Sequence, residues 1–186
     1  MPGAPTHLLD AGIELVAEHG LDGLTHPAVD ASAGVPPGST QRSFPTRQAL
    51  VEGVTTRCIE RELEMVSPPG ARIEASPDGL AAALGHFVVR ALGEHRAVTL
   101  ARYVLHAEAA RTPDLRAFYA VGADEVDTWA LDLVRRAGSR NPERDFGILA
   151  NYATGLVFHE LALPTPGLDA VARVRTVIDA LGWTTP

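Results

Sequence analysis

The stretch THPAVDASAGVPPGSTQRSFPTR, residues 25–47, decides the fold of this 186-residue chain. It opens with Thr25, whose hydroxyl can cap a helix, and Ala33-Gly34-Val35 divides it into two short helical segments. Gly34 can adopt the positive φ that a compact turn between helices requires. Two short helices joined by such a turn are typical of a helix-turn-helix, so the sequence predicts that motif here.

Helical periodicity extends outward from this motif, whereas the alternation typical of strands is almost absent. Before the motif, the pattern predicts a helix from a cap at Thr6 to a stop at Gly20. We expect a short helix over residues 37–43 and a long one from a cap at Thr46 through residue 63. Beyond a break at residues 67–77, helices are expected over residues 78–92, 94–110, 113–137, 143–163 and 168–181. The pattern therefore predicts an all-α chain of about nine helices.

The composition is that of a globular protein, with 46% hydrophobic and 21% charged residues. No apolar run approaches the ~18 residues that span a bilayer, and the first residues lack the pattern of a signal peptide. The single cysteine, Cys58, cannot form an internal disulfide. We therefore expect a cytoplasmic protein with no membrane partner.

The sequence offers no motif for catalysis. It contains no P-loop, GxGxxG, GxSxG or HExxH pattern, and His159-Glu160 lacks the second histidine of a zinc site. Other histidines and carboxylates are scattered without metal-ligand spacing. We therefore expect neither an enzyme nor a cofactor or metal site.

A helix-turn-helix reads DNA by presenting small or polar side chains of its second helix to base edges. Glutamine can read adenine and arginine can read guanine, while helix N-termini can hold phosphates. The expected motif core is Ile13, Val16, Val29, Val35, Phe44 and Leu50. The candidate DNA contacts are Thr25, Pro37, Ser39, Thr40, Gln41, Arg42, Ser43 and Arg47. The alternatives are a solvated face for Gln41 and Arg42, and a plain helix start for Arg47.

The first 55 residues resemble the DNA-binding domain of tetracycline-repressor (TetR) type regulators. The resemblance lies in Leu8-Leu9-Asp10-Ala11, Ala17-Glu18-His19-Gly20, Leu24-Thr25, Ala33-Gly34-Val35 and residues 44–50, FPTRQAL, at matching spacings. It implies a ligand-responsive repressor, a homodimer that binds a double-stranded DNA operator and an unknown small-molecule effector. It also implies a helix-turn-helix domain at residues 1–50 and a helical ligand-binding and dimerisation domain at residues 51–186.

Aromatic and small residues are the candidates for function in the body. The candidates to line an effector pocket are Phe87, Tyr103, His106, Phe118, Trp129, Tyr152 and Phe158, and ordinary core packing is the alternative for each. The candidates for the dimer interface are Ala150, Ala153, Val157, Val174 and Ile178. For these, the alternative is packing inside one subunit.

The motif departs from the family pattern at Pro36, Pro37, Gln41 and Ser43, where the family favours Ser or Thr, a basic residue, an aromatic residue and His. Residues 1–66 contain four arginines and nine acids, which gives a net charge of −5. Because affinity for DNA rests largely on phosphate neutralisation, we expect weak binding with a shallow dependence on salt. The alternative function is a ligand- or partner-binding module of the same fold with weak or lost DNA binding.

Overall fold

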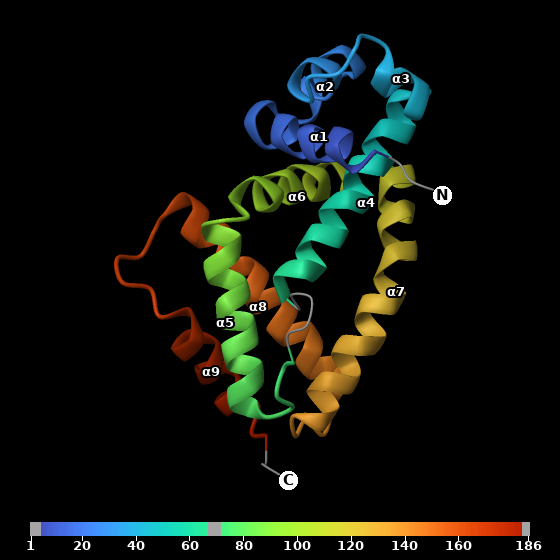
Figure 1. Ribbon diagram of the computed structural model, residues 1–186. Coiled ribbons are helices and arrows are strands. Elements are labelled where there is room, and N and C mark those ends of the chain that lie inside the picture. The colour runs from blue at the N-terminus through green and yellow to red at the C-terminus, as the bar shows by residue number, and fades with distance from the viewer. Residues whose placement is uncertain (1–4, 67–71, 184–186) are drawn as a thin grey trace. The chain divides into compact units, whose positions relative to one another are not determined.

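The computed structural model describes residues 5–66 and 72–183, and within these the side chains of all residues except 66 and 120–129. These residues form the helices of Figure 1: α1 (Thr6–His19), η1 (Leu21–Gly23), α2 (His26–Ser32), α3 (Ser39–Ser43), α4 (Arg47–Val66), α5 (Pro77–Leu92), α6 (Arg96–Ala109), α7 (Pro113–Arg136), α8 (Pro142–Ala162) and α9 (Ala170–Ala180). The described residues contain no strand, and none of their helices is long and apolar enough to cross a membrane. The prediction of an all-α chain is confirmed.

Local chemistry sets most helix ends. The Thr25 hydroxyl accepts the Ala28 N–H at 3.3 Å, and the Thr46 hydroxyl accepts the Ala49 N–H at 3.0 Å, as predicted for caps. Gly20 ends α1 with a φ of 68°. The predicted cap at Thr6 is wrong, because α1 already includes Thr6 and the preceding Pro5 has no side-chain acceptor.

The second helix of the motif begins later than the sequence predicts. It starts at Ser39 and not at Pro37, because Gly38 adopts a φ of 82° at its N-cap. Gly34 also takes a positive φ of 65°, as predicted for the turn. The two prolines at 36 and 37 therefore lie in the turn, and α3 has five residues.

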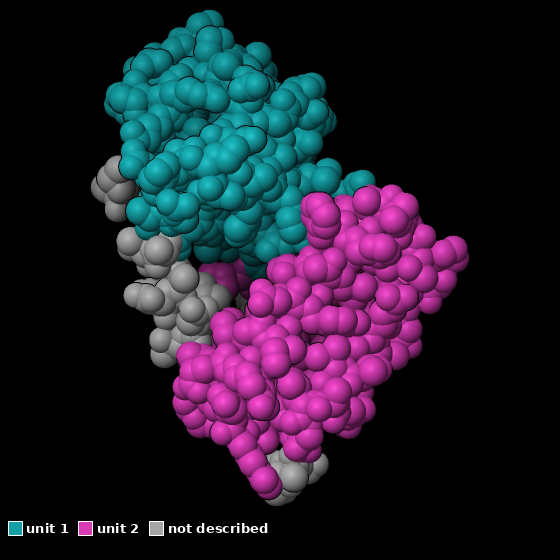
Figure 2. Space-filling model, turned by 180° about the vertical axis from the view of Figure 1, so that it is seen from behind, with its two compact units in different colours: residues 1–62, 96–122 teal, residues 63–95, 123–186 magenta. Residues whose placement is uncertain are grey.

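The helices pack as two compact units, shown in teal and magenta in Figure 2. Unit 1 comprises Met1–Glu62 and Arg96–Gly122, so α6 and the start of α7 pack with the helix-turn-helix. Unit 2 comprises Leu63–His95 and Ala123–Pro186. This division groups helices by packing and does not test the functional boundary predicted at residue 50.

The core of unit 1 is formed where α1 packs against α2 and α6 (Figure 1). Gly12 allows α1 to approach α4 closely, because a Cβ at this position would lie 2.6 Å from Cγ2 of Val54. The predicted core residues Ile13, Val16, Val29, Phe44 and Leu50 are buried, and Val35 is half-buried. The predicted core of the motif is therefore largely confirmed.

Unit 2 is built on α5, which packs against α9 and α8. Its core cluster consists of Leu80, Ala81, Leu133, Val134, Ala137, Leu149, Val174 and Ile178. The predicted interface residues Ala153, Val157, Val174 and Ile178 are at most 2% exposed within one chain, which favours the alternative that they pack inside one subunit. Ala150 is half-buried and lies beside the outer face of α8.

The contact between α5 and α9 depends on Gly85. A Cβ at this position would lie 2.7 Å from Cα and 2.8 Å from the backbone nitrogen of Val171. We therefore expect Gly85→Ala to push α9 away and lower the free energy of unfolding by about 1–3 kcal/mol, measured by urea denaturation. Gly147→Ala on α8 is the matched control, because no described atom lies within 4 Å of its Cβ. An equal effect of the two changes would contradict close packing at Gly85.

Candidate nucleic-acid interface

The helix-turn-helix is held together by the carboxylate of Asp30, which is 5% exposed near the end of α2. Its Oδ2 accepts the Gly38 N–H at 2.6 Å. Its Oδ1 accepts the Thr40 N–H at 2.8 Å and the Thr40 hydroxyl at 2.6 Å. One side chain of the first helix thus caps the second helix and fixes the angle between them.

These hydrogen bonds favour the charged form of Asp30. The pKa of its carboxyl is lowered, first by the Thr40 hydroxyl and then by the Thr40 N–H, against the opposing effect of burial. Thr40 itself is fully buried. This corrects the prediction that Thr40 belongs to the exposed face, because its side chain points at Asp30 and away from solvent.

The exposed side chains of the motif make local hydrogen bonds. Arg42 Nη2 donates to the Ser39 hydroxyl at 2.9 Å, and that hydroxyl donates to the Pro36 carbonyl at 2.6 Å. Gln41 Nε2 donates to the Pro45 carbonyl at 2.5 Å. Ser43, also exposed, donates to the Ser39 carbonyl at 3.4 Å. The face of α3 is therefore polar, ordered and accessible, and it contains one arginine and no acid.

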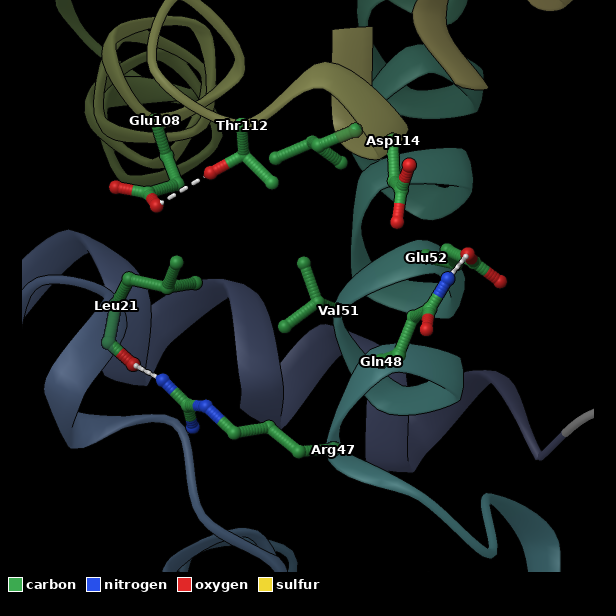
Figure 3. Close-up of a pocket in the computed structure, with 9 residues that line it drawn as sticks. Leu21, Arg47, Gln48, Val51, Glu52, Glu108, Thr112 and Asp114 are labelled. Carbon is green, nitrogen blue, oxygen red and sulfur yellow. Dashed lines mark hydrogen bonds between the residues drawn. The ribbon is translucent and has the colours of Figure 1, made fainter. Parts of the chain in front are cut away.

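Arg47 has a structural role that sequence reasoning missed. Its Nη1 donates to the Leu24 carbonyl at 2.6 Å and its Nη2 to the Leu21 carbonyl at 2.9 Å. These bonds join the start of α4 to the segment between α1 and α2, as Figure 3 shows for Leu21. The partners are backbone carbonyls more than twenty residues away, so no local pattern identifies them. Phosphate contact by Arg47 stays a prediction.

A groove of about 280 Å³ lies beside Arg47 within unit 1 (Figure 3). Its lining comes from η1, the first turns of α4 and the corner between α6 and α7: Leu21, Arg47, Gln48, Val51, Glu52, Glu108, Thr112, Asp114 and Leu115. Glu108 braces this corner by accepting from Arg111 at 2.6 Å and from Thr112 at 2.8 Å, and these bonds lower its pKa. The start of α4 and the α6–α7 corner therefore share one surface.

Part of the negative charge of the N-terminal segment is neutralised locally by ion pairs. Arg57 Nε lies 2.8 Å from Asp10, and its Nη1 lies 3.0 Å from Glu60. The Asp10 carboxylate is the main reason that the pKa of Arg57 is raised, and Glu60 adds to it. These charges lie on α1 and α4, so they do not set the charge of the α3 face.

The predicted effector-pocket residues are divided between the two units. Tyr103, His106 and Phe118 lie in unit 1, where the rings of His106 and Tyr119 stack with centroids 4.7 Å apart. Phe87 is buried in α5 of unit 2, and Tyr152 packs against the core cluster of that unit. The side chain of Trp129 lies outside the described residues.

Phe158 occupies a different place from the other candidates. It is 59% exposed on α8, so it does not line an enclosed cavity within the chain. This corrects its assignment to the effector pocket, because an enclosed pocket buries most of its lining.

A buried polar cluster on α4, α6 and α7 was not found from the sequence. It contains Glu62, Arg102 and Tyr119, with Cys58 beside them; burial raises the pKa of the Cys58 thiol to about 12. One signal was readable: Arg102 falls on the buried face of α6 that includes Val98 and Leu105. A charged residue at such a position requires a partner. The described residues contain no group of three or more His, Cys, Asp or Glu able to hold a metal.

An N-terminal helix-turn-helix with an accessible second helix, joined to a larger helical body, defines a class of DNA-binding transcription regulators. The family described as "Bacterial regulatory proteins, tetR family" matches residues 8–54, and "Tetracyclin repressor-like, C-terminal domain" matches residues 75–182. The chain therefore belongs to the TetR family of transcriptional regulators, which have an N-terminal DNA-binding domain and a C-terminal ligand-binding domain. This confirms the resemblance identified from the sequence.

Solved structures agree with this family. A transcriptional regulator from Rhodococcus sp. RHA1 is 21% identical, with 99% of this chain and 100% of that chain covered and a TM-score of 0.77. A TetR-family member from Streptomyces coelicolor is 25% identical, with 97% and 98% covered and a TM-score of 0.73. The multidrug binding protein EbrR, complexed with ethidium, is 26% identical, with 97% and 98% covered and a TM-score of 0.71. No curated protein matches the chain.

The bonds of Asp30 predict how the motif responds to substitution and to pH. Asp30→Asn places an amide donor against the donors from Gly38 and Thr40, so we expect it to lower the Tm by several degrees at neutral pH. Because the pKa of Asp30 is lower in the folded state, its contribution is fully present above the ordinary value of about 3.9. It is lost as the pH falls through the folded pKa.

The Tm difference between wild type and Asp30→Asn should therefore shrink below about pH 4. Glu14→Gln, at an exposed position of α1, is the control and should leave the Tm unchanged. A difference that stays constant down to about pH 2 would show that the charge of Asp30 does not stabilise the motif.

Proposed function

We propose that this chain is a homodimeric repressor that binds operator DNA through α3 and releases it when a small molecule binds its body. The observation that carries the proposal is the geometry of α3. Asp30 binds the N-terminal end of this helix, while the side chains of Gln41 and Arg42 are exposed to solvent. Such a regulator acts in the cytoplasm, where bacterial DNA lies. The proposal assigns it no catalytic activity.

The proposed DNA contacts come from α3 and the residues around it. Gln41 and Arg42 face bases or phosphates, and Ser39, Ser43 and Pro37 lie at the ends of the same face. Thr25 caps α2 and is exposed, so a phosphate could also approach that helix start. The local hydrogen bonds of Gln41 and Arg42 must open for base contact, which agrees with weak binding.

Two observations support an effector. EbrR, 26% identical to this chain, is a multidrug binding protein with structures in complex with ethidium and malachite green. The groove beside Arg47 is lined by both the start of α4 and the α6–α7 corner, so a molecule seated in it would contact both elements. All of its lining residues lie within unit 1.

The outer face of α8 supports a homodimer. Ile148, Asn151, Gly155 and Phe158 lie on one side of the helix, and all four are exposed. Phe158 is the largest exposed apolar side chain on this helix, and no described atom lies within 4 Å of a Cβ at Gly155. An exposed face that mixes apolar and small residues suits close helix packing across a two-fold axis.

DNA binding is best tested by fluorescence anisotropy with the DNA upstream of the protein's own gene. We expect Arg42→Ala to weaken binding by about 1–3 kcal/mol without lowering the Tm, because Arg42 is exposed. Arg47→Ala is the matched control and should lower the Tm, because it removes the bonds to Leu21 and Leu24. The salt dependence should be shallower than a slope of about −6. A Tm loss in Arg42→Ala, or a steeper slope, would contradict this interpretation.

The second candidate function is a binding module of the same fold that has lost operator binding. The net charge of −5 over residues 1–66 and the prolines at 36 and 37 favour it. Sequence-specific retardation of DNA in a gel-shift assay at low salt supports the repressor. Failure to bind any member of a random DNA pool at low salt supports the module.

The dimer is tested at Gly155, because an arginine there fits one chain but blocks close approach of a second α8. We expect wild type to sediment as a dimer and Gly155→Arg as a monomer with unchanged helicity. Glu94→Arg is the control for adding an arginine at an exposed position, and it should stay dimeric. A dimeric Gly155→Arg protein would remove the outer face of α8 from the interface.

A further inference from the structure

The cluster of buried Arg102 with half-buried Glu62 and Tyr119 joins three helices inside unit 1. Arg102 of α6 is 8% exposed, and its Nε lies 2.7 Å from Oε1 of Glu62 on α4. The Arg102 guanidinium lies over the ring of Tyr103, 4.5 Å from its centroid. The ring of Tyr119 on α7 stacks on His106 of α6. Packing on both sides thus fixes where these polar groups point.

Three donor atoms of the cluster make no hydrogen bond to any described residue. Among the residues that the structure describes, Nε and Nη2 of Arg102 and the hydroxyl of Tyr119 are buried and have no hydrogen-bond partner. The 2.7 Å contact to Glu62 is therefore an ion pair without hydrogen-bond geometry. Buried donors without partners are rare in folded proteins, and each destabilises the fold.

Burial also changes the acid–base behaviour of the cluster. It raises the pKa of Glu62 to about 7, with Arg102 opposing the shift, and it raises the pKa of Tyr119. The raised pKa of Tyr119 keeps its hydroxyl protonated at neutral pH, so the hydroxyl remains a donor. An acceptor oxygen that approaches the cluster then meets the donors of Arg102 and Tyr119 beside a carboxylate that Arg102 already pairs with.

We propose that Arg102 and Tyr119 are the polar anchor of the effector site, and that they bind a hydrogen-bond-accepting oxygen on an aromatic ligand. The inference rests on the proposed function, because it names the ligand class of the effector site. The stacked rings of His106 and Tyr119, with the ring of Tyr103 beneath Arg102, suit an aromatic body beside that oxygen. A cationic ligand fits less well, because it would lie next to the guanidinium of Arg102.

The test uses four one-ring probes with the full-length protein: benzamide and benzoate carry an acceptor oxygen, benzylamine carries a cation, and toluene carries neither. Binding is measured by isothermal titration and by the rise in Tm with probe concentration, both without DNA. The key variant is Tyr119→Phe, which removes only the hydroxyl without a partner. Thr56→Ala, which removes an exposed hydroxyl of α4, is the matched control.

We expect benzamide and benzoate to bind wild type at millimolar concentrations and more tightly than benzylamine and toluene. Tyr119→Phe should weaken binding of the two acceptor probes about tenfold, the effect of one hydrogen bond. Its Tm without ligand should be unchanged or higher, because a buried donor without a partner has been removed. Arg102→Lys keeps the positive charge but loses the planar guanidinium, so it should also weaken binding of benzamide and benzoate. Thr56→Ala should bind as wild type does.

Three results would overturn the proposal. The first is a lower Tm in Tyr119→Phe with unchanged probe binding, which indicates a structural hydroxyl. The second is preferential binding of benzylamine that Glu62→Gln abolishes, which indicates a cation site. The third is no binding of either acceptor probe.

Because this assay contains no DNA, its failure differs from failure of the proposed function. Probe binding that depends on Tyr119 but leaves operator binding unchanged supports the site and rejects its regulatory role. Operator binding together with a cation preference supports the regulator and rejects the assigned ligand class.

Discussion

The carboxylate of Asp30 is the constraint on which the N-terminal structure depends. Helix α3 has five residues, too few to be stable alone in water, so its position must come from tertiary contacts. Asp30 supplies them by accepting from two backbone N–H groups and one hydroxyl at the start of that helix. Because these bonds fix the backbone at the start of α3, only the exposed side chains of Gln41 and Arg42 would have to reorient on binding to DNA. The exposed face of α3 is thus held in place although its helix is short.

Arginines of this acidic chain differ in whether they are bound to other parts of the fold or lie exposed. Arg47 binds carbonyls at the α1–α2 connection, and Arg57 pairs with carboxylates between α1 and α4. Arg42 lies on the exposed face of α3. Delocalised guanidinium groups suit the structural positions, because they bind carbonyls and carboxylates through fixed forks and keep their charge when half-buried. The net charge of a segment therefore says little about the surface that it presents.

Sequence reasoning succeeded where short-range physics decides. Caps at Thr25 and Thr46, the stop at Gly20 and the turn at Gly34 each depend on a residue and its next few neighbours, so the pattern predicted them. Helical periodicity likewise identified every α-helix among the described residues to within about three residues. Membership of the TetR family followed from the spacing of these signals.

It failed where the side chain that decides lies far away in the sequence. The burial of Thr40 follows from Asp30, ten residues earlier. Val157 is buried and its neighbour Phe158 is exposed, because only one side of α8 faces α5. The sequence of α8 does not show which side this is. The cluster at Arg102 requires α4, α6 and α7 to be placed together, which periodicity along one helix cannot do.

The burial of Cys58 has a consequence for the chemistry of the whole molecule. Oxidants and electrophiles attack the thiolate, and this sulfur is both 1% exposed and held protonated. The only cysteine of the chain is therefore protected from oxidants and disulfide exchange while α4 stays packed. The rate at which a thiol reagent labels Cys58 therefore reports how often unit 1 opens locally around it.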